Sequence, residues 1–206
     1  MNKYIVALFF SVSSFTFSQQ LDPLLTDDRL AQQQWVDSVY QQMDLKQKVG
    51  QLFMARVYSK QDEKHIASVK KLIEEEHIGG LIYSLGGPVR QAKLNNELQG
   101  LSRFPLLIGM DAEWGLSMRL DSTYAFPYNT ALGAIKDNDL IEKTGKYLGR
   151  HCKRLGVHIN FAPDIDININ PDNPVIGNRS FGEDKYNVAQ KGLAFTRGMQ
   201  LSLIHI

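Results

Sequence analysis

The chain has 206 residues, of which 43% are hydrophobic and 22% charged, and its 23 basic and 22 acidic side chains leave a formal charge of +1. These values are typical of one globular domain and exclude a disordered or fibrous protein. The near-neutral balance does not indicate a nucleic-acid or anionic membrane partner, and Cys152, the single cysteine, excludes an intrachain disulfide and a cysteine-based metal site.

The first 18 residues have the pattern of a secretory signal peptide. Lys3 precedes the apolar run 4–10, and Ser18 is a small residue before two glutamines. The run is shorter than the roughly 20 residues that cross a bilayer, so we favour cleavage near Ser18 over an anchor, with a buried first helix as the alternative. We expect a secreted or periplasmic protein without membrane contact after cleavage, in which residues 19–34 form a lead-in segment.

Hydrophobic periodicity then predicts alternating helices and strands. A helical pattern covers residues 27–43, and Asp44 caps a second, short helix. The segments that follow are predicted as strand 52–57, helix 62–77, strand 81–84, a helix beginning at Pro88, strand 105–110, helix 137–155, strand 157–162 and helix 184–199. Strand followed by helix, four times, is the pattern of a parallel α/β fold.

Two parallel architectures compete: an open doubly wound sheet and a (β/α)8 TIM barrel. A doubly wound nucleotide-binding sheet carries GxGxxG after its first strand, whereas this chain has ARVYSKQDE at residues 55–63. A barrel places its active site on the loops after its strands, which is where the polar residues of this chain gather. We therefore favour the barrel, and we expect residues 35–200 to form only about half of it, because a complete barrel takes about 250 residues.

The segment GMDAEWGLSMRL, residues 109–120, ends an apolar run with charged side chains. A poorly solvated carboxylate at Asp111 needs a cation or strong donors, and Arg119 and Arg179 are the available partners. Two interpretations stay open: a buried ion pair that fixes two loops, and a ligand site. They are compatible, because a rigid carboxylate and forked guanidinium groups also suit the vicinal hydroxyls of a sugar. Trp114 offers an apolar face for a pyranose, although a lone tryptophan is more often packed.

A second polar segment, residues 160–184, contains three prolines that make it rigid. Asp164 and Asp166 lack the glycine and the terminal glutamate of a calcium loop. We expect them to cap turns and to pair with Arg179 rather than to act in catalysis. The histidines show no metal-ligand spacing, and no phosphate loop is visible, so we expect neither a metal nor a cofactor.

These motifs resemble the N-terminal catalytic barrel of glycoside hydrolase family 3, specifically its bacterial β-N-acetylglucosaminidase branch. MDLKQKVGQLF resembles the opening segment of the family, DAEWGLSMR its Asp-x-Glu-x-Gly-x-x-x-Arg segment, and NFAPDIDI with NPVIGNRSFGED its third characteristic stretch. The resemblance implies that Asp111, Arg119 and Arg179 bind the non-reducing-end sugar of a glycan substrate. Trp114 and Leu116 depart from the family form DxEGGRVxR, so recognition around the sugar is expected to differ.

The resemblance also implies a retaining hydrolase with an aspartate nucleophile and a general acid/base histidine. The Lys-His-Phe-Pro-Gly-His-Gly segment that carries this histidine in the family does not occur among the 206 residues, and the nucleophile lies further along the chain of family members. We therefore expect no catalytic residue here, an inactive fragment, and a non-native tail at residues 201–206, whose His205 has no catalytic role.

Three functions remain open. The first is a β-N-acetylhexosaminidase that removes terminal non-reducing β-linked N-acetylhexosamine residues from glycans or peptidoglycan fragments. The second is a non-catalytic carbohydrate-binding barrel that keeps Asp111 and the arginines. The third is a β-glucosidase or xylosidase of the same family. The absence of an arginine-rich RDPRWGR-type segment favours the hexosaminidase.

Overall fold

The computed structural model describes residues 28–60 and 62–202, and the chain divides after Gln42 into two units that are described separately. The predicted signal peptide and residues 203–206 of the predicted tail lie outside the described residues. In the first unit, helix α1 (Arg29–Gln41) begins at Asp28, whose carboxylate accepts the Ala31 N–H at 2.8 Å. The helix predicted at residues 27–43 is therefore present. No helix of the described ranges is long and apolar enough to cross a membrane.

The second unit alternates strands and helices. Helix α2 (Leu45–Gly50) begins with a reciprocal cap, in which Asp44 accepts the Gln47 N–H and the Gln47 side chain accepts the Asp44 N–H. The remaining elements are β1 (Met54–Tyr58), α3 (Glu63–Glu75), β2 (Gly80–Leu85), α4 (Pro88–Leu101), β3 (Leu107–Met110), η1 (Leu116–Met118), α5 (Asn129–Gly133), α6 (Asn138–Arg154), β4 (Ile159–Asn160), η2 (Gly177–Arg179) and α7 (Lys185–Gln200). The four predicted strand–helix repeats are confirmed.

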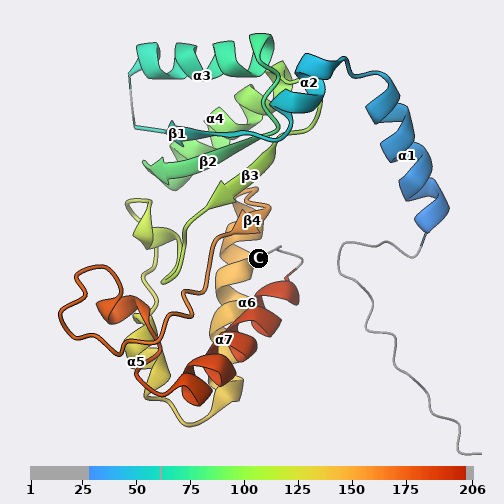
Figure 1. Cartoon of the computed structure of the whole chain (residues 1–206). Helices are drawn as coiled ribbons and strands as arrows, with labels where there is room; N and C mark the ends of the chain where they lie inside the picture. Colours follow the sequence, from blue (N-terminus) through green and yellow to red (C-terminus); the bar gives the residue numbers. More distant parts are fainter. Residues whose placement is uncertain (1–27, 61, 203–206) are drawn as a thin grey trace, which may run out of the picture. The chain divides into compact units, whose positions relative to one another are not determined.

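The strands form one parallel sheet in the order β1-β2-β3-β4 (Figure 1). This order follows the sequence without a reversal, which is the arrangement of a (β/α)8 barrel; a doubly wound sheet reverses its strand order at the ligand crevice. Four strands are half of the eight that close a barrel. The predicted α/β fold class, a TIM barrel with about half of its strands in this chain, is confirmed.

The two faces of the sheet carry different side chains. One face is covered and consists of the buried residues Val57, Leu81, Tyr83, Ile108 and Met110. On the other face, a Cβ at Gly109 would lie 2.8 Å from the Phe161 ring and 3.2 Å from Met54 Cε. Phe161 and Met54 are partly exposed there. Because side chains alternate along a strand, Asp111 continues this open face two residues after Gly109.

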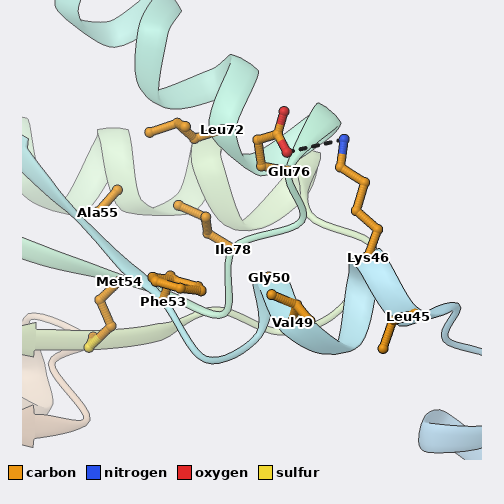
Figure 2. A pocket seen from close by; sticks show the side chains of 10 residues that line it. All are labelled: Leu45, Lys46, Val49, Gly50, Phe53, Met54, Ala55, Leu72, Glu76 and Ile78. Carbon is orange, nitrogen blue, oxygen red and sulfur yellow. Dashed lines mark ion pairs between the residues drawn. The ribbon is translucent and has the colours of Figure 1, made fainter.

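An apolar groove of about 630 Å³ lies between α2, the start of β1 and the end of α3 (Figure 2). Aliphatic and aromatic side chains dominate its lining, among them Val49, Phe53 and Leu72. Its two charged residues, Lys46 and Glu76, bind each other at 3.1 Å. The groove therefore offers few polar groups to a sugar, and it lies at the amino ends of the strands, opposite to the end that carries Asp111.

Helices α6 and α7 pack closely because glycines line their contact. A Cβ at Gly145 would overlap the Phe195 carbonyl oxygen, and a Cβ at Gly198 would overlap the Glu142 carbonyl oxygen. Cys152 lies fully buried on α6. Burial raises the pKa of the Cys152 thiol to about 12, because the apolar surroundings disfavour the thiolate.

This thiol should make stability depend on pH in the alkaline range. The folded thiol stays protonated up to about pH 12, whereas the unfolded thiol ionises near 9.0, so rising pH favours the unfolded state. Above about pH 9 we expect wild-type protein to lose about 1.4 kcal/mol of unfolding free energy per pH unit more than Cys152→Ala does. Urea denaturation of both proteins from about pH 8 to about pH 10 measures this difference. Parallel pH profiles would contradict the prediction.

Candidate functional site

Two polar loops meet at the carboxyl ends of β3 and β4. Asp111 follows β3 directly, and Asp164 follows β4 after a cis peptide bond between Ala162 and Pro163. Asn160 joins the loops, because its Oδ1 accepts the Ala112 N–H at 2.9 Å and its Nδ2 donates to the Ala112 carbonyl oxygen at 3.4 Å. The carboxyl ends of barrel strands are where active sites form, so these loops are the candidate site.

Asp111 and Arg119 form the first ion pair of the site. Arg119 follows the short helix η1, which returns the chain to the strand end, and its Nη2 lies 2.6 Å from Asp111 Oδ2. The two side chains are 27% (Arg119) and 32% (Asp111) exposed. Arg119 Nε is buried and donates to no described residue. The pair thus leaves a carboxylate and a guanidinium partly exposed beside the open face of the sheet.

Arg179 forms a second, more buried cluster with two carboxylates. Its Nε lies 3.0 and 3.1 Å from the two Glu113 carboxylate oxygens, and its Nη2 lies 2.8 Å from Glu113 Oε1 and 3.1 Å from Asp164 Oδ2. The hydrogen bond with Glu113 raises the pKa of Arg179, and the negative charges of Glu113 and Asp164 add to this effect. Asp164 also caps a turn by accepting the Asp166 N–H at 2.8 Å, as expected from the sequence.

The structure divides the three predicted sugar-binding residues between two clusters. Among the described residues, Asp111 forms its ion pair with Arg119 and not with Arg179. The sequence offered both arginines as partners, and Glu113 binds the second one instead. The interpretation of a buried ion pair that fixes two loops holds for the Arg179 cluster, whereas the Asp111–Arg119 pair lies within one loop and is about one-third exposed. Sugar binding by Asp111, Arg119 and Arg179 stays a prediction.

Two further residues of the site were not assigned a role from the sequence. The sequence indicates Glu113 only as one of the charged side chains of residues 109–120. In the structure its side chain is 3% exposed and binds Arg179. Arg56 on β1 donates from Nη1 to the Tyr58 hydroxyl at 3.4 Å, which raises the pKa of Arg56, and the negative charge of Asp111 makes a smaller contribution. The sequence signal for Arg56 is the alternation of side chains along β1. Arg56 and Tyr58 flank the buried Val57 and therefore lie on the opposite face of the strand.

The two departures from the family motif have different positions. Leu116 is 7% exposed and belongs to the hydrophobic core, so it stabilises the loop and does not line a ligand surface. Trp114 is partly exposed and contacts Tyr128 edge to face, with ring centroids 4.8 Å apart. Only the departure at Trp114 therefore reaches the surface of the site.

Two of the histidines, His65 and His158, accept hydrogen bonds from the backbone. His65 Nε2 accepts the Tyr58 N–H at 3.2 Å, and His158 Nδ1 accepts the Ile108 N–H at 3.0 Å. Within residues 28–60 and 62–202, no group of at least 3 His, Cys, Asp or Glu side chains is placed to hold a metal ion. The described side chains of the two clusters are carboxylates and guanidinium groups, which form strong charge-assisted hydrogen bonds.

Comparison with known proteins connects this arrangement to a glycosidase family. Residues 44–205 match the glycosyl hydrolase family 3 N-terminal domain. The chain is 29% identical to a β-N-acetylglucosaminidase/β-glucosidase of Cellulomonas fimi over 85% of this chain and 30% of that protein. It is 34% identical to β-hexosaminidase A of Pseudoalteromonas piscicida over 64% of this chain and 24% of that protein.

A solved structure extends this comparison to the fold. The glycoside hydrolase family 3 β-N-acetylglucosaminidase of Paenibacillus sp. str. FPU-7 matches with a TM-score of 0.70 and 41% identity, over 79% of this chain and 32% of that one. The present chain thus spans 30%, 24% and 32% of the lengths of these three proteins.

Proposed function

Because the chain belongs to glycosyl hydrolase family 3, as its motifs predicted, we propose that it supplies the sugar-binding part of a retaining β-N-acetylhexosaminidase. The substrate is a glycan or peptidoglycan fragment with a terminal, non-reducing β-linked N-acetylhexosamine. The observation that carries this proposal is the partly exposed Asp111–Arg119 pair, 2.6 Å apart, at the carboxyl edge of a parallel sheet.

The two ion-pair clusters have complementary tasks in this proposal. Asp111 accepts hydrogen bonds from vicinal sugar hydroxyls, and Arg119 donates to the same oxygens. Arg179 is held through Nε and Nη2, and its Nη1 donates to no described residue, so this nitrogen remains a donor for a ligand. A guanidinium that is already fixed loses little conformational entropy when it binds a sugar.

In this proposal, the reacting groups belong to polypeptide outside these 206 residues. This placement is supported by the lack of a Lys-His-Phe-Pro-Gly-His-Gly segment, which carries the acid/base histidine in the family. The 206-residue chain should then bind an N-acetylhexosaminide without hydrolysing it. A second candidate is β-glucosidase activity, which the name of the Cellulomonas fimi relative includes.

Ligand-observed NMR of the purified chain with methyl β-glycosides of N-acetylglucosamine, glucose and xylose tests the proposal. We expect the N-acetylglucosaminide to bind roughly tenfold more tightly than the glucoside, the value of about one additional hydrogen bond. We also expect no release of p-nitrophenol from p-nitrophenyl β-N-acetylglucosaminide.

Each deviation has a distinct meaning. Tighter binding of the glucoside or the xyloside would select the corresponding glycosidase instead. Release of p-nitrophenol by the 206-residue chain would show that its reacting groups lie within it. Binding of these glycosides without hydrolysis, both by this chain and by a longer protein that also carries the rest of the barrel, would select the non-catalytic carbohydrate-binding barrel.

A further inference from the structure

Two aromatic side chains form a partly exposed pair beside the candidate site. Trp114 and Tyr128 meet with ring centroids 4.8 Å apart and an interplanar angle of 66°. Tyr128 is 48% exposed, and Trp114 is partly exposed. Both rings are thus accessible enough to contact a ligand.

The pair is fixed next to Arg179 from both sides. Glu113, the neighbour of Trp114 in the sequence, binds the Arg179 guanidinium through Nε and Nη2. Asn129, the neighbour of Tyr128, donates from Nδ2 to the Arg179 carbonyl oxygen at 2.6 Å. Each ring therefore stands one residue away from a direct contact with Arg179.

The loop between the two rings is also held in place. The Phe126 N–H donates to the Trp114 carbonyl oxygen at 3.0 Å, which closes the loop. Gly115 has a φ of +93°, and a Cβ there would lie 2.8 Å from the Phe126 ring, so only glycine fits. The aromatic pair thus lies on a loop whose conformation is fixed by this hydrogen bond and by Gly115.

The chemistry of the pair complements that of the ion pairs. A β-linked pyranose with equatorial substituents has polar edges and faces made of C–H groups, and such faces pack on aromatic rings, while indole N–H and phenol O–H groups can reach hydroxyls. We propose that Trp114 and Tyr128 bind the second sugar ring of a β-linked oligosaccharide whose terminal ring is held by Asp111. This inference rests on the proposed function and assigns two residues to the sugar ring next to the terminal one.

The chain allows a direct optical test, because Trp35 and Trp114 are its 2 tryptophans. In a Trp35→Phe background, Trp114 is the sole tryptophan. We expect its emission to change on titration with N,N′-diacetylchitobiose and to change less with N-acetylglucosamine. Isothermal titration calorimetry should give the same dissociation constant for the disaccharide as the emission change does.

Variants separate a binding role from a packing role. We expect Trp114→Ala to weaken binding of the disaccharide about tenfold and that of the monosaccharide less than about twofold. Trp114→Phe keeps a ring and should retain most of the affinity, which guards against a folding defect. The matched control is Tyr124→Ala, which removes an exposed ring of the same loop that contacts Phe126 instead, and which should leave both affinities unchanged.

The outcomes distinguish this inference from the function on which it rests. If the disaccharide binds in an Asp111-dependent manner but Trp114→Ala and the wild type have equal affinities, the aromatic site is refuted and the proposed function stands. If the wild type binds neither sugar, the proposed function fails for this chain, and the aromatic site fails with it.

Discussion

Replacement of Glu113 by alanine should lower the free energy of unfolding of the second unit by about 3 kcal/mol. The Glu113 side chain is 3% exposed and accepts hydrogen bonds from two nitrogens of Arg179. Removing one partner of a buried pair leaves the other charge incompletely compensated, here with Asp164 alone. Arg179 is 34% exposed and regains some hydration, so we expect the lower end of the range for broken buried pairs.

Urea denaturation followed by circular dichroism measures this loss, and the exposed Arg90–Asp121 pair supplies its control. Arg90 and Asp121 lie 2.6 Å apart, but their side chains are 54% and 57% exposed. Asp121→Ala should therefore cost less than about 1 kcal/mol. Equal losses in Glu113→Ala and Asp121→Ala would mean that burial of the Glu113 carboxylate contributes nothing to the stability of the loops.

The alternation of strands and helices and the position of Asp111 could be predicted because both depend on local signals. Short apolar runs that alternate with helical patterns indicate a parallel sheet, and a charge directly after such a run indicates the carboxyl end of a strand. The strand predicted at residues 157–162 pairs only over Ile159–Asn160. A strand forms only where its backbone pairs with a neighbouring strand, and apolar character alone does not determine how many residues form such pairs.

The sequence predicted one partner of Arg179, Asp164, but not the other, Glu113, because charge alone does not choose between carboxylates. Glu113 and Arg179 are 66 residues apart in the sequence. Their contact depends on the path of two loops, which is set by hydrogen bonds such as those of Asn129 with the Arg179 carbonyl oxygen and of Asn160 with Ala112. Asn129 lies outside the quoted motifs, and the motif NFAPDIDI, which begins at Asn160, does not indicate the backbone groups that Asn160 contacts.

The helix α5 was also missed, for a different reason. It spans five residues, Asn129–Gly133, and has no side-chain cap at Tyr128. A helix of this length shows no hydrophobic period, so only its tertiary contacts reveal it. Asn129 and Thr130 supply those contacts, because they donate to the carbonyl oxygens of Arg179 and Ser180. The segment between the predicted strand 105–110 and the predicted helix 137–155 thus contains a short helix that holds the loop carrying Arg179.

Replacement of Asp111 by asparagine should lower the affinity for sugar and leave the free energy of unfolding almost unchanged, whereas the loss of Glu113 should lower the free energy of unfolding. We expect the affinity for methyl β-N-acetylglucosaminide to fall roughly 10- to 100-fold, because hydrogen bonds to a charged acceptor contribute about 1.5 to 3 kcal/mol. The free energy of unfolding should change by less than about 1 kcal/mol, since the Asp111–Arg119 pair is about one-third exposed. Calorimetric titration and urea denaturation of the same preparation measure the two quantities.

The control for this prediction is Asp121→Asn, which makes the same chemical change in an exposed ion pair of equal length, 2.6 Å. It should leave sugar affinity within about twofold of the wild type, because the partner of Asp121 is Arg90, which belongs to neither cluster. A loss of stability of about 3 kcal/mol in Asp111→Asn would instead assign Asp111 a structural role like that of Glu113. An unchanged affinity in a stably folded Asp111→Asn protein would remove Asp111 from the sugar site, and with it the observation that carries the proposed function.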